Sequence, residues 1–208
     1  MTIRIDERYV VRAPPAAVWE FLVDPRCVVS CIPGGELEEV LDERNFHGRI
    51  EVVVGPFTLV YRGRVRLAEI DAAALRVRIV GEAREPSRAG SSRLVLDSWL
   101  LPTADGGTQV VAVIRADVAG RIVRLLRGMV EELARLAFRE FAAAVRESLE
   151  AEAASRAAVA AGAPAPSPRR AAPAPRPPLH PVPLLLRAVR SWAARLVRPG
   201  GGDPMPHP

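Results

Sequence analysis

Apolar and polar residues alternate over several stretches of the chain, and the clearest stretch lies between residues 57 and 67. There the apolar positions are Phe57, Leu59, Tyr61, Val65 and Leu67, and the polar positions are Thr58, Arg62, Arg64 and Arg66. Because successive strand residues point to opposite faces, this pattern predicts a strand with one buried and one solvated face. The pattern recurs at Leu75, Val77 and Ile79, at residues 3–11 and, less sharply, at residues 108–116.

Turn signals divide residues 36–118 into successive antiparallel strands. They are Arg44-Asn45, Gly55-Pro56, Asp71-Ala72 and Asp105-Gly106-Gly107. Ahead of these strands, APPAAVWEFLVDP (13–25) predicts a short helix between its Pro-Pro start and its Asp-Pro end. VVSCIPGG (28–35) predicts a further helical turn that a Pro-Gly-Gly break ends.

Residues 120–154 have the periodicity of one long amphipathic helix. Its apolar stripe is Val123, Leu126, Val130, Leu133, Ala137 and Phe141, and the opposite side carries Arg121, Arg124, Glu131, Arg135, Arg139 and Arg146. A helix of about 30 residues is about 45 Å long and can cover the apolar face of a sheet. The pattern predicts an α+β helix-grip fold, a curved antiparallel sheet wrapped on a long C-terminal helix, with an internal hydrophobic cavity.

The composition changes after this helix and predicts four segments. They are a ligand-binding domain (1–155), a Pro/Ala-rich disordered linker (156–181), a basic amphipathic helix (182–199) and a disordered tail (200–208). Four arginines inside residues 183–199 exclude a membrane span, which needs about 20 mostly apolar residues. A basic helix with Trp and Leu on one face suits the membrane interface, and docking on a protein is the alternative.

The charge of the chain favours acidic partners. Its net charge is +5, its pI is near 10.4, and all 29 basic residues are arginine. Arg62, Arg64, Arg66, Arg76 and Arg78 would form a basic stripe outside the sheet, but no interleaved aromatic residues accompany it, so no nucleic acid is expected. Arg121, Arg124 and Arg127 crowd the start of the long helix, where the helix dipole disfavours positive charge, and they favour anionic headgroups or an acidic protein.

Catalytic and metal-binding motifs are not found. The histidines are His47, His180 and His207, and the sequence has no Ser-His-Asp arrangement, HExxH, phosphate loop or GxGxxG. Cys27 and Cys31 stand four residues apart without further soft ligands, which favours packing over metal binding. The acidic run Glu36, Glu38, Glu39, Asp42 and Glu43 favours a solvated face or a protein-docking edge. We expect no enzyme activity, no metal and no covalent cofactor.

Five short motifs occur in order. They are CIPG (31–34), VGPF (54–57), GSS (90–92), GGT (106–108) and DVAG (117–120). Together they resemble the CoxG-like family of carbon monoxide dehydrogenase subunits, within the START-like, or SRPBCC, superfamily, over residues 1–150. The resemblance implies a helix-grip fold with a hydrophobic pocket and no catalytic residues. It also implies service to a molybdenum hydroxylase such as carbon monoxide dehydrogenase, either by recruiting the enzyme to the membrane or by carrying quinone to it.

The sequence and the resemblance together predict a non-enzymatic carrier of an isoprenoid quinone (menaquinone or ubiquinone) or a lipid. Its expected pocket is lined by Phe57, Leu59, Tyr61, Leu75, Val77, Ile79, Leu126, Met129, Val130 and Leu133, with a mouth at Cys31, Ile32, Pro33 and Gly34. Its expected membrane contacts are Leu185, Leu186, Arg187, Val189, Arg190, Trp192, Arg195, Leu196 and Arg198. A pure membrane-recruitment or assembly factor with no bound ligand is the alternative. An enzyme becomes the better hypothesis if Tyr61 and His47 face one cavity.

The expected location is the cytoplasm, peripheral on the inner face of the cell membrane. MTIRIDERYVV at the start of the sequence has no apolar stretch of the secretory kind, and two cysteines are typical of a reduced compartment. The partners expected there are anionic lipid, the carbon monoxide dehydrogenase complex and the quinone or lipid itself.

Overall fold

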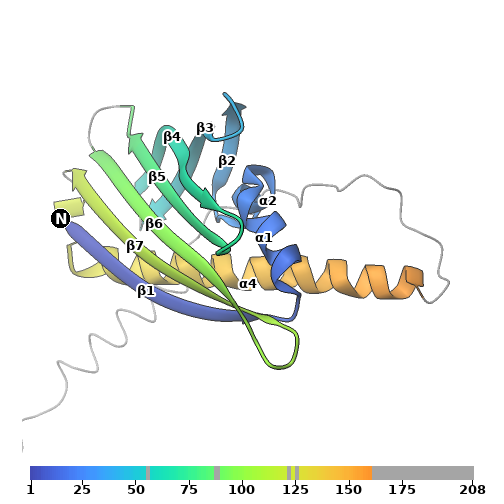
Figure 1. The fold of residues 1–208 in the computed structure, drawn as a ribbon. Coiled ribbons are helices and arrows are strands. Elements are labelled where there is room, and N and C mark those ends of the chain that lie inside the picture. The colour runs from blue at the N-terminus through green and yellow to red at the C-terminus, as the bar shows by residue number, and fades with distance from the viewer. Residues whose placement is uncertain (55–56, 87–89, 121–122, 125–126, 161–208) are drawn as a thin grey trace, which may run out of the picture.

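In the residues that the structure describes, one curved antiparallel sheet is accompanied by two short helices and one long helix. The computed structural model describes residues 1–54, 57–86, 90–120, 123–124 and 127–160. The sheet has seven strands in the order β1-β7-β6-β5-β4-β3-β2 (Figure 1). The elements are β1 (Thr2–Val11), α1 (Pro15–Val23), α2 (Pro25–Cys31), β2 (Gly35–Val40), β3 (Asn45–Val54), β4 (Phe57–Asp71), β5 (Arg76–Arg84), β6 (Gly90–Pro102), β7 (Thr108–Gly120) and α4 (Arg127–Ala160).

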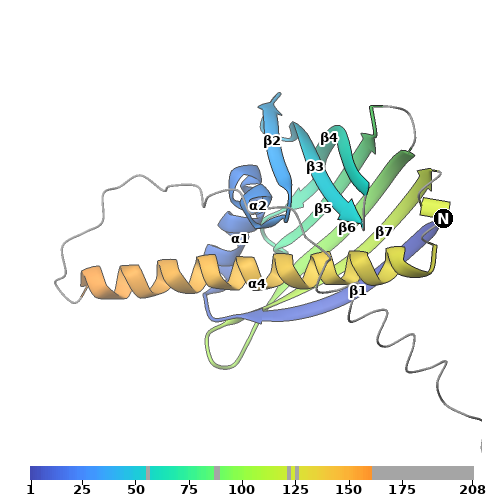
Figure 2. The same cartoon turned by 180° about the vertical axis from the view of Figure 1, so that it is seen from behind.

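The sheet curls so that its concave side faces the helices, and α4 runs along this side (Figures 1 and 2). The only break in sequential strand order is β1, which pairs with β7 at the edge of the sheet that lies beside α4. This is the predicted α+β helix-grip arrangement, and the long covering helix is confirmed.

Local sequence explains the two short helices. Each begins with proline in its first turn, where the missing N–H costs no helical hydrogen bond. Asp24 lies between them, and its carboxylate accepts the N–H of Arg26 at 2.8 Å and so caps α2. Gly34 follows with a positive φ of 72°, a conformation that favours glycine, and it turns the chain into β2.

The strand register places the predicted apolar positions on the concave side and the arginines on the convex side. Ile5 of β1 pairs with Ile114, which pairs with Leu96, and Leu96 pairs with Ile79. Residues directly opposite one another point to the same face, so this apolar row crosses four strands. The neighbouring row on the convex side carries Arg78 of β5.

Gly63 lies where β4 approaches β5 most closely. A Cβ atom there would collide with the carbonyl oxygen of Glu82, so a larger residue cannot occupy this position without backbone movement. A register shift between Leu67 and Glu69 lies a short way further along the same strand. The close approach at Gly63 and the bulge after Leu67 together bend the sheet towards its concave side.

The hydrophobic core occupies one end of the molecule, which we call the packed end. It joins α1, α2 and the C-terminal half of α4 to the ends of β1, β6 and β7, through Tyr9, Val11, Ala13, Val18, Phe21, Cys27, Cys31, Leu100, Val110, Ala142, Ala144, Val145 and Leu149. A smaller cluster contains Phe46, Leu67 and Val77, and Trp19 packs against both clusters.

The structure corrects three details of the sequence prediction. β7 continues to Gly120, where the sequence predicted the start of the long helix; residues 123–124 are helical, and α4 is described from Arg127. α4 also continues to Ala160, past the predicted boundary at residue 155. Leu75 lies before β5 in a turn, with a positive φ of 49°, and its carbonyl accepts the N–H of Leu100 at 3.1 Å. The tail helix (182–199) and residues 200–208 lie outside the described residues.

Candidate ligand-binding face

An apolar surface lies on the concave side of the sheet away from the packed end. By strand register it consists of Ile50, Val52, Leu59, Tyr61, Val65, Ile79, Gly81, Leu94, Leu96, Ile114 and Ala116, and we call it the concave apolar face. Each of these residues keeps part of its surface exposed, and Val65 is 38% exposed. The corresponding concave residues of the packed end, such as Val110 at 2%, are buried. Among the residues that the structure describes, these side chains are covered less completely than those of the packed end, although Ile79 packs against the cluster of Phe46, Leu67 and Val77.

The helix that crosses the sheet shows the same division. Ala142, Ala144, Val145 and Leu149, in the C-terminal half of α4, are buried in the packed end. Met129, Val130, Leu133, Leu136 and Ala137, in its N-terminal half, are only half-buried. α4 is thus packed most tightly towards its C-terminal half, and its other half runs along the concave side of the sheet (Figure 2).

Small residues widen this face. Gly48 pairs with Gly63 across β3 and β4, and Gly63 pairs with Ala83 of β5. Next to them, a Cβ atom on Gly81 would meet the Leu94 Cβ atom at an ordinary contact distance of 3.7 Å. A methyl group could therefore be added at Gly81 without a clash, in ordinary contact with Leu94 and Val65.

The predicted pocket residues divide between this face and the core. Leu59, Tyr61 and Ile79 are half-buried on the concave apolar face, as Met129, Val130 and Leu133 are on α4. Val77 is 3% exposed and belongs to the second core cluster, whereas Leu75 is partly buried in its turn and packs against the packed end. The side chains of Phe57 and Leu126 lie outside the described residues.

Sequence reasoning missed several residues of the face. Their strands carry apolar residues on both sides, as in VLDSWLL, so the alternation of apolar and polar positions is hidden. The residues missed in this way are Ile50, Val52, Leu94 and Leu96. Only their register with neighbouring strands assigns them to the concave side. The signal that could have found them is the pairing with β4 and β7, where the alternation is readable.

The predicted mouth includes one core residue. Cys31 is 1% exposed and packs with Tyr9 and Val18, whereas Ile32, Pro33 and Gly34 are half-buried. The Cys27 thiol is also buried and lies 3.5 Å from the Asp24 carboxylate. Both cysteines are packing residues, and a mouth at residues 32–34 stays a prediction.

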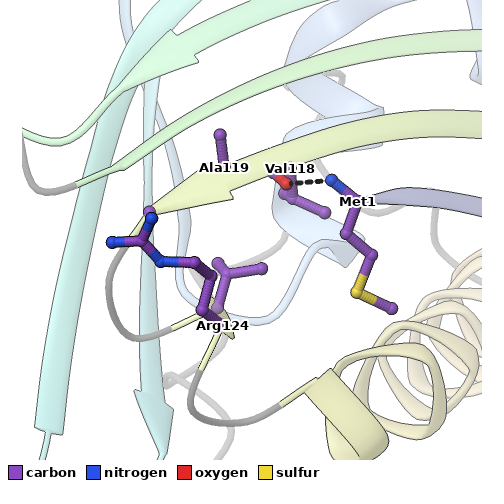
Figure 3. Close-up of a pocket in the computed structure, with 6 residues that line it drawn as sticks. Met1, Val118, Ala119 and Arg124 are labelled. Carbon is purple, nitrogen blue, oxygen red and sulfur yellow. Dashed lines mark hydrogen bonds between the residues drawn. The ribbon is translucent and has the colours of Figure 1, made fainter.

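A small pocket lies at the C-terminal end of β7, which is the end away from the packed end (Figure 3). It has a volume of about 190 Å³ and is lined by Met1, Val118, Ala119, Gly120, Val123 and Arg124. The Met1 amino group closes one side by donating a hydrogen bond to the Val118 carbonyl oxygen at 2.9 Å. This pocket is not the expected one between sheet and helix, and an enclosed internal cavity stays a prediction.

Polar groups also occur on the concave side, along the seam between β1 and α4. The Glu7 carboxylate lies 3.7 Å from the Arg135 guanidinium, and both side chains are about one-third exposed, at 29% and 34%. The Arg146 guanidinium lies 5.8 Å from the centre of the Tyr9 ring. Arg135 and Arg146 thus lie beside β1, although Arg146 remains exposed.

The pair that would have favoured an enzyme is not brought together. Tyr61 lies on the concave side, while His47 lies on the convex side and pairs with Glu39 at 3.2 Å. The acidic run is likewise engaged in cross-strand ion pairs, since Glu36 accepts from Arg49 at 2.7 Å and Glu38 from Arg62 at 2.9 Å. In the part of the chain that the structure describes, no three His, Cys, Asp or Glu residues gather as metal ligands.

The convex arginine stripe is partly neutralised by acids. The Asp97 carboxylate is 9% exposed and accepts a hydrogen bond from the Arg78 Nε atom at 2.7 Å, with Arg115 at 3.8 Å and Arg76 at 3.9 Å. Arg78 also donates to Glu69 at 2.8 Å. Such cross-strand pairs stabilise the solvated side of a sheet. Among the described helices, none is both long and apolar enough to span a membrane.

Comparison with known proteins supports both the fold and the family. A conserved protein of Geobacillus kaustophilus aligns with a TM-score of 0.64 and 17% identity over 72% of this chain and 95% of its own. The Zhui aromatase/cyclase of Streptomyces sp. R1128 aligns at 0.55 and 18%, over 72% and 94%. A Thermus thermophilus protein aligns at 0.54 and 21%, over 73% and 99%. At these identities the likeness shows a shared fold alone.

The sequence comparison is more specific. No curated protein matches the chain at a significant level. The family of CoxG, the G-type subunit of carbon monoxide dehydrogenase, matches residues 8–152, which span the sheet, the short helices and most of α4. The chain therefore belongs to the CoxG family of carbon monoxide dehydrogenase subunits.

Proposed function

We propose that this protein is a non-enzymatic accessory protein that binds an isoprenoid quinone or a similar lipid on its concave apolar face. In this proposal the protein serves a carbon monoxide dehydrogenase-type molybdenum hydroxylase at the membrane. The description of the family as a carbon monoxide dehydrogenase component supports the enzyme as the partner. Residues 182–199, whose sequence is basic and amphipathic, support the membrane as the place.

The exposure of the concave apolar face is the observation that carries the proposal. Val65 keeps 38% of its surface exposed although it points to the side that the helix covers. A soluble domain normally fills such a face, and unfilled apolar surface commonly marks a ligand or partner site. Burying apolar ligand surface there contributes about 25 cal/mol per Å², so a long isoprenoid or acyl chain would supply most of its own binding free energy.

Extraction of quinone from vesicles tests the ligand. The full chain is incubated with vesicles that contain a prenylated naphthoquinone, the vesicles are removed by flotation, and quinone is measured in the protein fraction. We expect near-stoichiometric quinone with the protein. A protein fraction without quinone, from a chain that still binds vesicles, would favour the pure recruitment factor.

Vesicle binding by tail variants tests the membrane contact. Trp192→Glu places a charge on the apolar side of residues 182–199, and Ser191→Glu places the same charge on the polar side as a matched control. On vesicles that contain anionic lipid, Trp192→Glu should weaken binding by about tenfold or more, because Trp and Leu provide the buried apolar area. Equal effects of the two substitutions would show that charge alone, and not an inserted apolar face, holds the protein.

A further inference from the structure

One hydroxyl group inside the packed end has no hydrogen-bond partner. Tyr9 is 7% exposed, and its phenolic oxygen is the buried side-chain atom without a partner among the residues that the structure describes. A buried hydroxyl that makes no hydrogen bond costs about 1–3 kcal/mol. Phenylalanine would avoid this cost at the same position, so the hydroxyl calls for a partner from outside the described residues.

The position of Tyr9 is at the border between the packed end and the concave apolar face. Along β1, the concave side chains run Tyr9, Glu7, Ile5, and their partners on β7 are Val110, Ala112 and Ile114. Val110 belongs to the buried core, whereas Ile114 is already half-exposed. Tyr9 is therefore the β1 residue at which the packed end meets the face on which we place the ligand.

The surroundings of Tyr9 select the chemistry of its partner. Phe138 meets its ring edge-on at 6.0 Å, and Cys31 packs in the same cluster. Burial raises the pKa of the Tyr9 hydroxyl above its ordinary value of 10.0, so the group is neutral and can donate its proton in a hydrogen bond. Arg146, whose guanidinium lies 5.8 Å from the centre of the Tyr9 ring, is an exposed residue and stays hydrated. A charged ligand group beside the buried hydroxyl would lose its hydration, and an uncharged oxygen loses far less.

We propose that the Tyr9 hydroxyl binds an uncharged carbonyl oxygen of the apolar ligand, so that the ligand enters the concave side with its oxygen-bearing end first. The inference rests on the proposed function and adds the orientation of the ligand and its polar anchor. Quinone rings and lipid esters both carry such a carbonyl. This binding mode requires the half-buried Phe138 ring, which packs edge-on against Tyr9, to move aside for the carbonyl.

Tyr9→Phe removes the hydroxyl and keeps the ring. With the full chain, isothermal titration compares a short-chain prenyl naphthoquinone, the same prenyl naphthalene without oxygens, and methyl oleate as a lipid ester. We expect Tyr9→Phe to weaken binding of the naphthoquinone or the ester by about tenfold and to leave binding of the naphthalene unchanged. If Tyr9→Phe weakens binding of the naphthoquinone alone, the partner of the hydroxyl is a quinone carbonyl. If it weakens binding of the ester alone, the partner is a lipid carbonyl.

Two further measurements separate this role from a structural one. Val10→Thr, at the next residue on the convex side, should leave all three affinities unchanged. The empty Tyr9→Phe protein should melt at the same temperature as the wild type or higher, since an unpaired hydroxyl is removed. Equal affinity of wild type and Tyr9→Phe for both oxygen-bearing probes would overturn the anchor and leave the proposed function standing. A wild-type chain that binds none of the probes would overturn both.

Discussion

Val65 and Val10 are two exposed valines on opposite sides of the same sheet. Val65, 38% exposed, points to the concave side, and Val10, 44% exposed, points to the convex side. The two residues have the same chemistry and nearly the same exposure, so they separate the effect of the ligand face from the general effect of a strand substitution. At the residue scale, we expect the side of the sheet that a residue faces to decide whether its substitution affects ligand binding.

Val65→Asp should strongly weaken ligand binding, whereas Val10→Asp should leave it unchanged. A carboxylate on the concave apolar face would lose its hydration against an apolar ligand, which should lower affinity by at least about tenfold. Both substitutions replace a strand-favouring residue at a half-exposed site, so each should cost about 1 kcal/mol of unfolding free energy. Titration with naphthoquinone and denaturant unfolding measure the two effects, and equal ligand affinities would rule out the concave face as the binding site.

The buried Tyr9 hydroxyl should make the protein sensitive to alkali. Burial raises the pKa of Tyr9 in the folded state above 10.0, so its neutral form contributes stability fully below that pH. As the pH rises above about 10, the unfolded chain releases the proton first, and the unfolding free energy should fall by about 1.4 kcal/mol per pH unit for this group. Tyr61, whose pKa is raised by partial burial and by Glu85, adds a smaller fall.

Denaturant unfolding between about pH 8 and about pH 11 measures this fall, and Tyr9→Phe should make it clearly shallower. An identical pH profile for the two proteins would show that the Tyr9 hydroxyl is accessible to water in the folded state.

At the scale of elements, the sequence correctly predicted the helices and strands whose structure depends on their own residues. Alternation in β4 and the proline-bounded α1 are strong single-segment signals, and both are confirmed. Leu75 was misassigned because the alternation with Arg76 continues into a turn whose conformation the pattern does not report.

Gly63 should tolerate no side chain, whereas its neighbour Gly81 should. A Cβ atom at Gly63 would collide with the Glu82 carbonyl oxygen, but one at Gly81 would have only ordinary contacts. Gly63→Ala should therefore lower the unfolding free energy by about 1–3 kcal/mol, and Gly81→Ala should change it little. Thermal and denaturant unfolding of the pair test whether this close approach holds the curve of the sheet; equal stabilities would contradict it.

The two halves of α4 should differ in their contribution to stability. Leu149 is 1% exposed in the packed end, and Leu133 is half-buried over the concave side. Leu149→Ala should cost about 2–5 kcal/mol of unfolding free energy, as expected for a filled core position. Leu133→Ala should cost clearly less, because fewer protein atoms surround it. Similar costs for the two leucines, measured by denaturant unfolding, would mean that the helix packs on the sheet along its whole length.

At the scale of the whole molecule, the fold was predictable and the site only in part. One-sided strands followed by one long amphipathic helix leave few arrangements, and the helix-grip fold is among them. The concave apolar face depends on long-range register, such as Ile50 with Tyr61 and Leu94 with Ala116, which no single segment encodes. Val77 was assigned to the pocket for a related reason. Alternation shows which residues of a strand point to the buried side, but it does not show how far along the strand the core extends.

The identity of what occupies the concave apolar face tests the proposed function most directly. The full chain is produced in a quinone-containing bacterium and purified without detergent, and bound small molecules are extracted and measured by mass spectrometry. We expect a near-stoichiometric isoprenoid quinone, or another lipid with an uncharged carbonyl, in the wild type and its loss in Val65→Asp. An empty extract from a folded wild-type chain would contradict the carrier function and leave a protein that recruits its partner without carrying a ligand.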